Sequence, residues 1–173
     1  MLNQIKNMIK TERCIIRPLE EKDFEVLIDM YQEPDSNKYV GPLRDKTIDF
    51  YRSFLENKKF LNNEELGFFS VSTKDSKEII GTVNVNVFML LKLPQVGIHL
   101  RRKYWRQGYA SELMAALLDY AKTEKNWDTI YGIFETDNQA SKSLMKKFDF
   151  EPKEQTDIQG VSLEIYSKSL KTL

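Results

Sequence analysis

The sequence has very little of the chemistry that builds disulfides or metal centres. Its 173 residues include one cysteine, Cys14, and one histidine, His99. A single cysteine cannot form an intrachain disulfide, and thiolate- or histidine-rich metal sites need several such residues close together. We therefore expect a protein without a metal ion, working in a reducing cytoplasm.

Long apolar runs and an excess of one charge are also missing. No stretch approaches the roughly 18 apolar residues of a membrane span, and the first ten residues lack the apolar stretch of a signal peptide. Lys and Arg number 26, as do Asp and Glu. Because nucleic-acid binding depends on a basic excess that neutralises phosphates, we expect neither a nucleic acid nor a membrane as partner.

The remaining composition is that of an ordinary globular protein. Hydrophobic residues make up 41% and charged residues 30% of the chain, and no repeat, low-complexity tract or linker divides it. A length of this order fits one domain. We therefore expect a single domain that spans residues 1–173.

Apolar residues recur with two periods along the chain, one typical of strands and one typical of helices. Together they predict a strand, two helices, three strands, a helix, a strand, a helix and a last strand. This order indicates an α/β (α+β) domain with a mixed, mostly antiparallel sheet flanked by helices. The predicted strands are Cys14–Leu19, Phe68–Ser72, Ile79–Phe88, Gln95–Leu100, Thr129–Glu135 and Val161–Ser167. The predicted helices cover Glu21–Tyr31, Ile48–Leu55, a segment from Gly108 through Ala121, and Gln139–Lys147.

The segment with the most informative chemistry joins the fourth strand to the third helix. The strand ends at Leu100, a turn containing Gly108 follows, and a long helix begins. A helix N-terminus offers unpaired N–H groups and partial positive charge, so it suits an anion such as a diphosphate. The glycine patterns of a dinucleotide-binding turn and of a P-loop are missing. Taken alone, this turn fits equally well a helix start that binds nothing.

Residues 105–110, Trp-Arg-Gln-Gly-Tyr-Ala, resemble the pyrophosphate signature of the GNAT superfamily of N-acetyltransferases. Trp105 departs from the Gln or Arg of that signature, but this form, completed by Glu112, is usual in the ribosomal-protein N-acetyltransferase (RimJ/RimL-type) branch. Three further segments agree in the right order: residues 11–19 with Asp23, Ile79–Gly81, and Asn138–Leu144 with Lys147–Phe150. The resemblance covers roughly residues 11–168.

This resemblance implies a GNAT fold and acetyl-CoA as cosubstrate, with no metal. In this family the strand before the signature splays from its neighbour, and the pantothenate arm fills the gap. Asn138 is also a preferred residue for capping the helix that follows it, which is compatible with a place beside the arm. The residues implied to bind the cofactor are Ile98, Leu100, Arg106, Gln107, Gly108, Tyr109, Ala110 and Asn138.

The resemblance also suggests how the leaving thiolate receives a proton. Many members of the superfamily use a tyrosine at the position of Met145, which cannot donate a proton. Ser141 aligns with the serine that the ribosomal-protein branch is thought to use near the sulfur. We therefore predict that Ser141 donates a hydrogen bond to the thiolate. The alternative is an ordinary helix serine that bonds its own backbone.

Two residues are candidates for the base that removes a proton from the amine. Glu135, at the end of the strand before Asn138, is the first, and His99 is the second. If side chains alternate, His99 lies on the opposite strand face from Ile98 and Leu100. The alternatives are a solvated strand end for Glu135 and a packed or surface histidine for His99.

The function we predict is acetyl transfer to a primary amine, foremost the amine of a protein or peptide N-terminus. A small-molecule amine, such as a polyamine or an aminoglycoside, and a non-catalytic acetyl-CoA-binding module are the alternatives. We expect the acceptor surface to lie in Pro34–Arg44 and Asn84–Leu93. The chain is expected to be a monomer or a homodimer.

Overall fold

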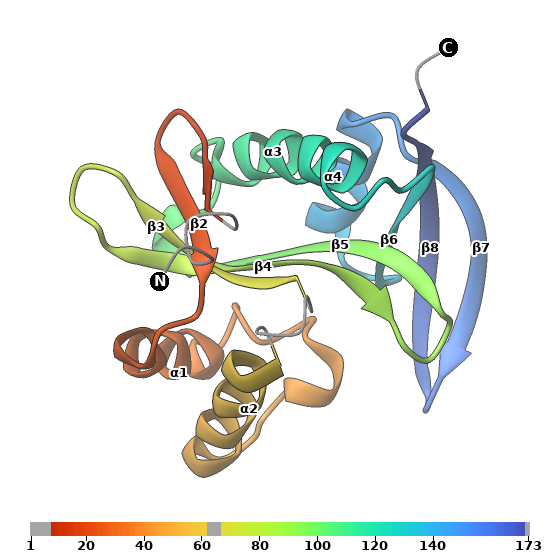
Figure 1. Cartoon of the computed structure of the whole chain (residues 1–173). Coiled ribbons are helices and arrows are strands. Elements are labelled where there is room, and N and C mark those ends of the chain that lie inside the picture. The colour runs from red at the N-terminus through yellow and green to blue at the C-terminus, as the bar shows by residue number, and fades with distance from the viewer. Residues whose placement is uncertain (1–7, 62–66, 172–173) are drawn as a thin grey trace.

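A sheet of eight strands runs through the middle of the computed structural model, which describes residues 8–61 and 67–171. The strands lie in the order β1-β2-β3-β4-β5-β6-β8-β7 (Figure 1). All neighbouring strands are antiparallel except β5 and β6, which are parallel. The bounds are Ile9–Lys10 for β1, Cys14–Pro18 for β2, Phe68–Thr73 for β3, Ile79–Phe88 for β4, Leu93–Leu100 for β5, Thr129–Glu135 for β6, Glu151–Ile158 for β7 and Val161–Ser169 for β8.

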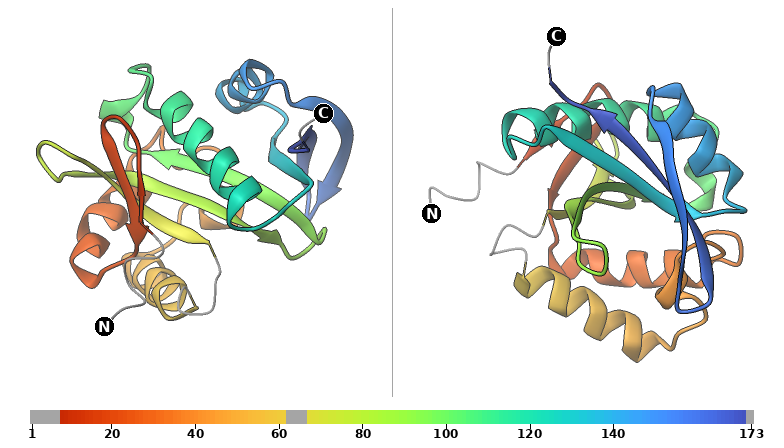
Figure 2. Two further views of the ribbon diagram at one scale, coloured as in Figure 1. Left: turned by 45° about the horizontal axis from the view of Figure 1, so that its top comes forward. Right: turned by 90° about the vertical axis from the view of Figure 1, so that its right-hand side faces the viewer.

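Helices cover both faces of the sheet. The helices α3 (Tyr109–Thr123) and α4 (Gln139–Lys147) lie on one face, and α1 (Phe24–Gln32) and α2 (Ile48–Leu61) lie on the other (Figures 1 and 2). Short 3-10 turns occupy Glu21–Asp23, Gly41–Leu43 and Arg102–Tyr104. This arrangement confirms the predicted fold class.

The two faces of the sheet are stabilised by separate groups of buried side chains. The apolar stripe of α3 packs on one face, and α1 and α2 enclose the other. Burial of one such large side chain contributes about 1.5–3 kcal/mol, so each helix is held mainly by its sheet-facing residues. The stripe of α3 consists of Leu113, Met114, Leu117 and Ala121, all buried, whereas Leu27, Met30 and Tyr31 of α1 pack with Tyr51 and Leu55 of α2.

The structure also contains two strands that the sequence pattern does not predict, β1 and β7. The strand β7 is a charged edge strand whose first five residues are exposed, so it lacks the apolar alternation that marks a half-buried strand. Pro94, expected to precede the fourth predicted strand, instead lies inside β5 and pairs with Val87. The first helix opens as a 3-10 turn and becomes an α-helix at Phe24.

Two special features are absent from residues 8–61 and 67–171. No helix there is long and apolar enough to cross a membrane. No group of three or more His, Cys, Asp or Glu side chains is arranged to hold a metal ion.

Candidate active site

The parallel strands β5 and β6 separate after a short contact. In the described part of the chain, only one residue pair joins the two strands, Gln95 with Tyr131. By contrast, β5 pairs with β4 from Leu93 to Leu100, and β6 pairs with β8 from Thr129 to Glu135. The two strands therefore run on beside each other with their facing edges unpaired, as an extended ligand requires.

Backbone groups of β5 point toward this gap at the positions expected from the sequence. In an antiparallel pair, residues alternate between those that exchange both hydrogen bonds with the partner and those that direct them away. The N–H of Arg101 donates to Ile80 at 2.9 Å, which fixes the phase of the ladder. It follows that Ile98 and Leu100 direct their backbone groups toward β6.

The opposite edge of the gap presents Ile133, which the sequence interpretation missed. The N–H of Thr136 donates to Ser162 at 3.1 Å, so Ile133 and Glu135 direct their backbone groups toward β5. The carbonyl of Glu135 is already engaged, because it accepts from the N–H of Asn138 at 2.8 Å. Ile133 lies beyond the one described pair that joins β6 to β5, so its backbone groups are available to a ligand. Only the strand pairing, which the sequence does not reveal, identifies this residue.

The turn after β5 leads into the N-terminus of α3. Gly108 is the N-cap with φ of 83°, in the left-handed region, and Arg106 also has positive φ, 57°. Glycine adopts this conformation without the steric cost that a side chain brings. No side chain among the described residues caps the helix, so the N–H groups of Tyr109, Ala110 and Ser111 are available to an anion.

A buttress of polar contacts from the β1–β2 turn holds this helix start. Glu112 accepts hydrogen bonds from the backbone N–H and the Nε of Arg13, both at 2.7 Å, and from the hydroxyl of Thr11. The Nη1 of Arg13 donates to the carbonyl of Gln107 at 3.0 Å, and its guanidinium lies 4.0 Å from the centre of the Tyr109 ring. We call Arg13 with Glu112 the buttress pair.

The contact with Gln107 sets the direction of the next N–H group. In a trans peptide the C=O and the following N–H point in opposite directions. Because Arg13 holds the Gln107 carbonyl, the N–H of Gly108 points away from Arg13. The peptide between Gln107 and Gly108 is therefore already oriented before an anion binds to this turn.

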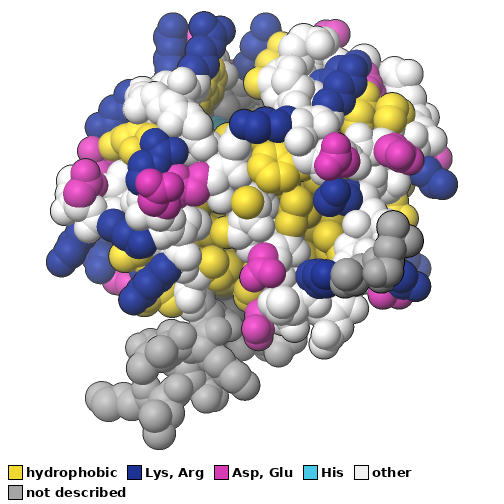
Figure 3. Space-filling model, turned by 90° about the horizontal axis from the view of Figure 1, so that it is seen from above, with side chains coloured by type: hydrophobic (Ala, Val, Ile, Leu, Met, Phe, Trp, Pro, Cys, Tyr) yellow, Lys and Arg dark blue, Asp and Glu magenta, His cyan; other side chains and the backbone are white. Residues whose placement is uncertain are grey.

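The side chain of Trp105, the first residue of the signature, stabilises the turn after β5. Its indole N–H donates to the carbonyl of Leu100 at 2.7 Å, closing the turn behind β5. Leu100 consequently keeps its N–H, and not its carbonyl, for a ligand in the gap. Arg102, Lys103 and Arg106 around this turn are exposed. Figure 3 views the molecule from the side of α3 and α4, and Lys and Arg side chains lie along the upper edge of this view.

Ser141 and Met145 lie one helical turn apart on the same side of α4. Met145 is buried against β6, where a Cβ on Gly132 would lie 2.3 Å from its sulfur, so this helix side faces the sheet. The hydroxyl of Ser141 makes no hydrogen bond within residues 8–61 and 67–171. The side chain of Asn138 accepts from the N–H of Ser141 at 3.1 Å, which confirms the predicted N-cap.

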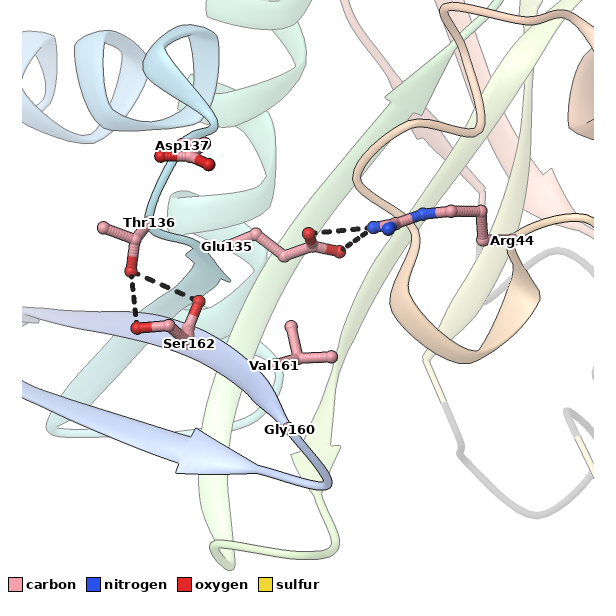
Figure 4. Close-up of a pocket in the computed structure, with 7 residues that line it drawn as sticks. All are labelled: Arg44, Glu135, Thr136, Asp137, Gly160, Val161 and Ser162. Carbon is pink, nitrogen blue, oxygen red and sulfur yellow. Dashed lines mark hydrogen bonds and ion pairs between the residues drawn. The ribbon is translucent and has the colours of Figure 1, made fainter.

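Glu135 lies in a small cavity at the end of β6. The cavity measures about 320 Å³ and is lined by Arg44, Glu135, Thr136, Asp137, Gly160, Val161 and Ser162 (Figure 4). The carboxylate of Glu135 accepts from Nη2 of Arg44 at 2.7 and 2.8 Å and from the N–H of Gly41 at 3.2 Å. A carboxylate offers about four acceptor positions, so one remains for a further donor.

His99 faces the α1 side of the sheet, opposite to Ile98 and Leu100, as alternation predicts. Its Nε2 lies 2.8 Å from the carbonyl oxygen and 2.7 Å from the hydroxyl of Ser36, and its ring centre lies 5.3 Å from that of Tyr31. Because a carbonyl only accepts, we assign the proton to Nε2. Burial lowers the pKa of His99 to about 4, so the ring is neutral at pH 7.

One loop is fastened on both sides of the gap. On the β5 side, Arg102 binds Asp35 at 2.8 Å and donates its N–H to Glu33, and His99 binds Ser36. On the β6 side, Glu135 binds Gly41 and Arg44. Residues 33–44, which we call the bridging loop, therefore connect the two strand ends on the face opposite α3. This loop contains all of Pro34–Arg44, the first of the two segments expected to form the acceptor surface.

The second segment expected there, in β4 and the following hairpin, presents a polar row. The amide of Asn84 donates to Asn86 at 3.1 Å, and Gln95 donates to the same oxygen at 3.1 Å. Val83 and Val85 are buried on the other face, because side chains alternate between the two faces of a strand. Val87, at 43% exposed, is the exception, and it lies beside the turn that joins β4 to β5.

The structure thus gathers the predicted residues at one edge of two strands. Gln107, Gly108, Tyr109 and Ala110 lie at the helix start, Ile98 and Leu100 border the gap, and Asn138 and Ser141 begin α4. The carboxylate of Glu135 forms an ion pair with Arg44, and the Nε2 of His99 forms a hydrogen bond with Ser36. Cys14 lies on β2, fully buried, and its burial raises the pKa of the thiol.

Comparison with known proteins gives concordant matches. A family model described as an acetyltransferase (GNAT) domain matches residues 13–151. The chain is 25% identical over 146 residues to the uncharacterized N-acetyltransferase YoaA of Bacillus subtilis, covering 83% of this chain and 82% of that protein. It is 27% identical over 166 residues to the uncharacterized N-acetyltransferase p20 of Bacillus licheniformis, covering 92% and 93%.

Solved structures of similar shape include a GNAT-family acetyltransferase from Bacillus anthracis, with a TM-score of 0.81, 24% identity and coverage of 94% of this chain and 98% of that one. The ribosomal alpha-N-protein acetyltransferase RimL in complex with coenzyme A has a TM-score of 0.76 and 14% identity, with coverage of 94% of this chain and 98% of that one. The microcin self-immunity acetyltransferase MccE in complex with acetyl-CoA and AMP has a TM-score of 0.74 and 19% identity, with coverage of 91% of this chain and 93% of that one. At these identities the likeness shows the fold alone.

Proposed function

The chain belongs to the acetyltransferase (GNAT) family, and from that premise we propose that it acetylates an α-amine, foremost the N-terminal amine of a protein or peptide. It is an acetyl-CoA-dependent acyltransferase. The observation that supports the site is the pair of unpaired edges on β5 and β6, which ends at the uncapped N-terminus of α3.

The residues present fit acetyl-CoA. We assign the diphosphate to the N–H groups of Tyr109, Ala110 and Ser111, where the helix terminus favours negative charge. The Lys147 ammonium, 2.8 Å from the hydroxyl of Ser111, adds positive charge there. The backbone groups of Ile98 and Ile133 offer donors and acceptors to the amide-containing arm. Acetyl-CoA, when bound, supplies the activated acetyl thioester.

Two side chains handle protons in this proposal. Ser141 faces the sheet with an unused hydroxyl and holds a proton for the leaving sulfur. Glu135 keeps one acceptor position in the cavity at the end of β6 and takes a proton from the attacking amine. Arg44 and Gly41, which hold this carboxylate in place, orient it for that task.

An α-amine suits a site whose candidate base is already engaged. With an ordinary pKa near 7.8, roughly one α-amine in seven is neutral at pH 7, whereas fewer than about one lysine amine in a thousand is. The first therefore reacts with little help, and the second depends on a strong base. Glu135 is paired with Arg44 and is therefore a weak base, which suits an α-amine better than a lysine amine.

Likeness of shape gives modest support to the ribosomal-protein branch. RimL, described as a ribosomal alpha-N-protein acetyltransferase, shares the fold at 14% identity, and residues 105–112 follow the form usual in that branch. A small-molecule amine is the second candidate. MccE, which shares the fold at 19% identity, was solved with AMP, and a cavity of about 320 Å³ is of a size that admits a small acceptor.

Calorimetric titration with acetyl-CoA, followed by assay of thiol release with peptides that have free N-termini, tests this function. We expect saturable one-to-one binding of acetyl-CoA, no binding of NADH or ATP, and thiol release that stops when the peptide N-terminus is blocked. Binding without release by any peptide or small amine would contradict the proposed activity.

A further inference from the structure

The cavity at the end of β6 contains an arginine whose hydrogen-bonding capacity is partly unused. Both oxygens of Glu135 bind Nη2 of Arg44. The Nε and Nη1 groups have no hydrogen-bond partner in the described ranges 8–61 and 67–171. A guanidinium has five N–H donors in one plane, so Arg44, 41% exposed, can donate to an oxygen of a second molecule.

The orientation of this guanidinium is set before any ligand arrives. Glu135 is itself held by the N–H of Gly41 at 3.2 Å and is only 16% exposed. A donor held in place loses little conformational entropy when it binds. Arg44 therefore differs from a free surface arginine, which must be ordered by its ligand.

The cavity has an acidic end as well as a basic one. Asp137 lines it and makes no side-chain hydrogen bond or ion pair in the part of the chain that the structure describes. Figure 4 shows Asp137 and Arg44 on opposite sides of Glu135. A ligand that carries an amine at one end and an oxygen acceptor a few bonds away complements this arrangement. An alkylamine or polyamine offers no oxygen to Arg44.

The position of the cavity relates it to the reacting amine. Glu135 directs its backbone toward the gap and its carboxylate into the cavity, and Asp137 precedes Asn138 at the start of α4. The atoms next to an amine that reaches the gap therefore lie in this cavity. In an α-amine, the first oxygen is two bonds beyond the amine-bearing carbon.

We propose that Arg44 is a specificity-determining residue that binds this oxygen, and so selects α-amines over simple alkylamines. The oxygen is the first carbonyl of a peptide or the carboxylate of a free α-amino acid. The proposal rests on the acetyltransfer proposed above and names its acceptor class.

The test compares three acceptors: a trialanine amide peptide, free alanine and n-propylamine. The value of kcat/KM for each is measured by thiol release at saturating acetyl-CoA in the wild type, in Arg44→Ala and in Arg44→Lys. The control is Arg52→Ala. Arg52 is also 41% exposed and also binds a glutamate, Glu25, at 2.5 Å, but it lies on α2 outside the cavity.

We expect Arg44→Ala to lower kcat/KM for the peptide or alanine, relative to propylamine, by about ten- to a hundredfold, the effect of losing a hydrogen bond from a charged donor. Arg44→Lys should lower this ratio less, and Arg52→Ala should leave it unchanged. A larger fall for alanine identifies a carboxylate, and a larger fall for the peptide identifies an N-terminus.

Equal losses for all three acceptors in both Arg44 variants would overturn the proposal, because a displaced bridging loop or a weakened fold affects every acceptor alike. If the wild type acetylates these amines but the ratio is insensitive to Arg44, this inference fails and the acetyltransferase proposal stands. If the wild type binds no acetyl-CoA, or acetylates no amine, both fail.

Discussion

Ser141 is the residue whose chemical role separates most cleanly from binding. Its hydroxyl faces the sheet without a partner among the described residues, while its N–H is taken by Asn138. Ser141→Ala removes a donor and leaves the helix intact, because alanine is the better helix former. We expect kcat to fall about a hundredfold, as for loss of a general acid, with little change in the Kd of acetyl-CoA.

Ser143→Ala is the matched control for this variant. Ser143 lies on the same helix but is exposed, so its replacement should change neither quantity. If Ser141→Ala kept full turnover, protonation of the sulfur would have to come from elsewhere, and the assignment of Ser141 would be wrong.

Between elements, the contact of the β1–β2 turn with the start of α3 holds the proposed anion site in place. The buttress pair joins the β1–β2 turn to α3, and Arg13 fixes the peptide between Gln107 and Gly108. We expect Arg13→Ala to weaken acetyl-CoA binding by about tenfold, the equivalent of about 1.4 kcal/mol, and to lower kcat much less. Calorimetry gives the Kd, and initial rates give kcat.

A double-mutant cycle shows whether the two members of the buttress pair act together. Glu112 affects the turn by holding Arg13, so adding Glu112→Gln to Arg13→Ala should cost little further affinity. Additive losses would mean that Glu112 supports the helix start by a separate route. A lower thermal midpoint alone, with unchanged Kd, would make the pair purely structural.

The elements that sequence patterns predict are those whose signal is local. The alternation around Val83 and the stripe of α3 identify their own structures, because each residue's burial follows from its period. The strand β7 has no such signal: it is extended because β8 pairs with it from Glu151 to Ile158. Long-range pairing decides its state, and a local pattern cannot show that.

The same distinction explains which parts of the site were predictable. Residues 105–110 are contiguous, so their motif can be recognised in the sequence. Arg13 and Glu112 are 99 positions apart, and Arg44 and Glu135 are 91 apart. Nothing near either residue indicates its partner. The gap-facing backbone of Ile133 depends on sheet register, which is equally non-local.

At the scale of the whole molecule, His99 links stability to pH. Burial lowers its pKa to about 4, against about 6.5 in an unfolded chain. Below pH 6.5 the unfolded chain therefore takes up a proton that the folded one does not. The stabilisation is complete above pH 6.5 and is lost as the pH falls toward 4.

We expect the free energy of unfolding to drop by about 2 kcal/mol between pH 7 and pH 5. His99→Gln, which keeps a donor for Ser36, should remove most of this dependence. Urea unfolding at both pH values measures it, and no other histidine contributes because the chain has one. Parallel pH profiles for the two proteins would show that His99 is protonated at its ordinary pKa in the folded state.

The anchoring of the bridging loop has a kinetic consequence. The loop joins the strand ends on the α1 face, whereas the helix terminus assigned to the diphosphate belongs to the α3 face (Figure 1). Donor and acceptor thus approach one strand edge from opposite sides, and neither has to depart before the other arrives. Double-reciprocal rate plots at several fixed acetyl-CoA concentrations should intersect, as for a ternary complex. Parallel lines would require the protein to carry the acetyl group itself, and its one thiol, Cys14, is fully buried.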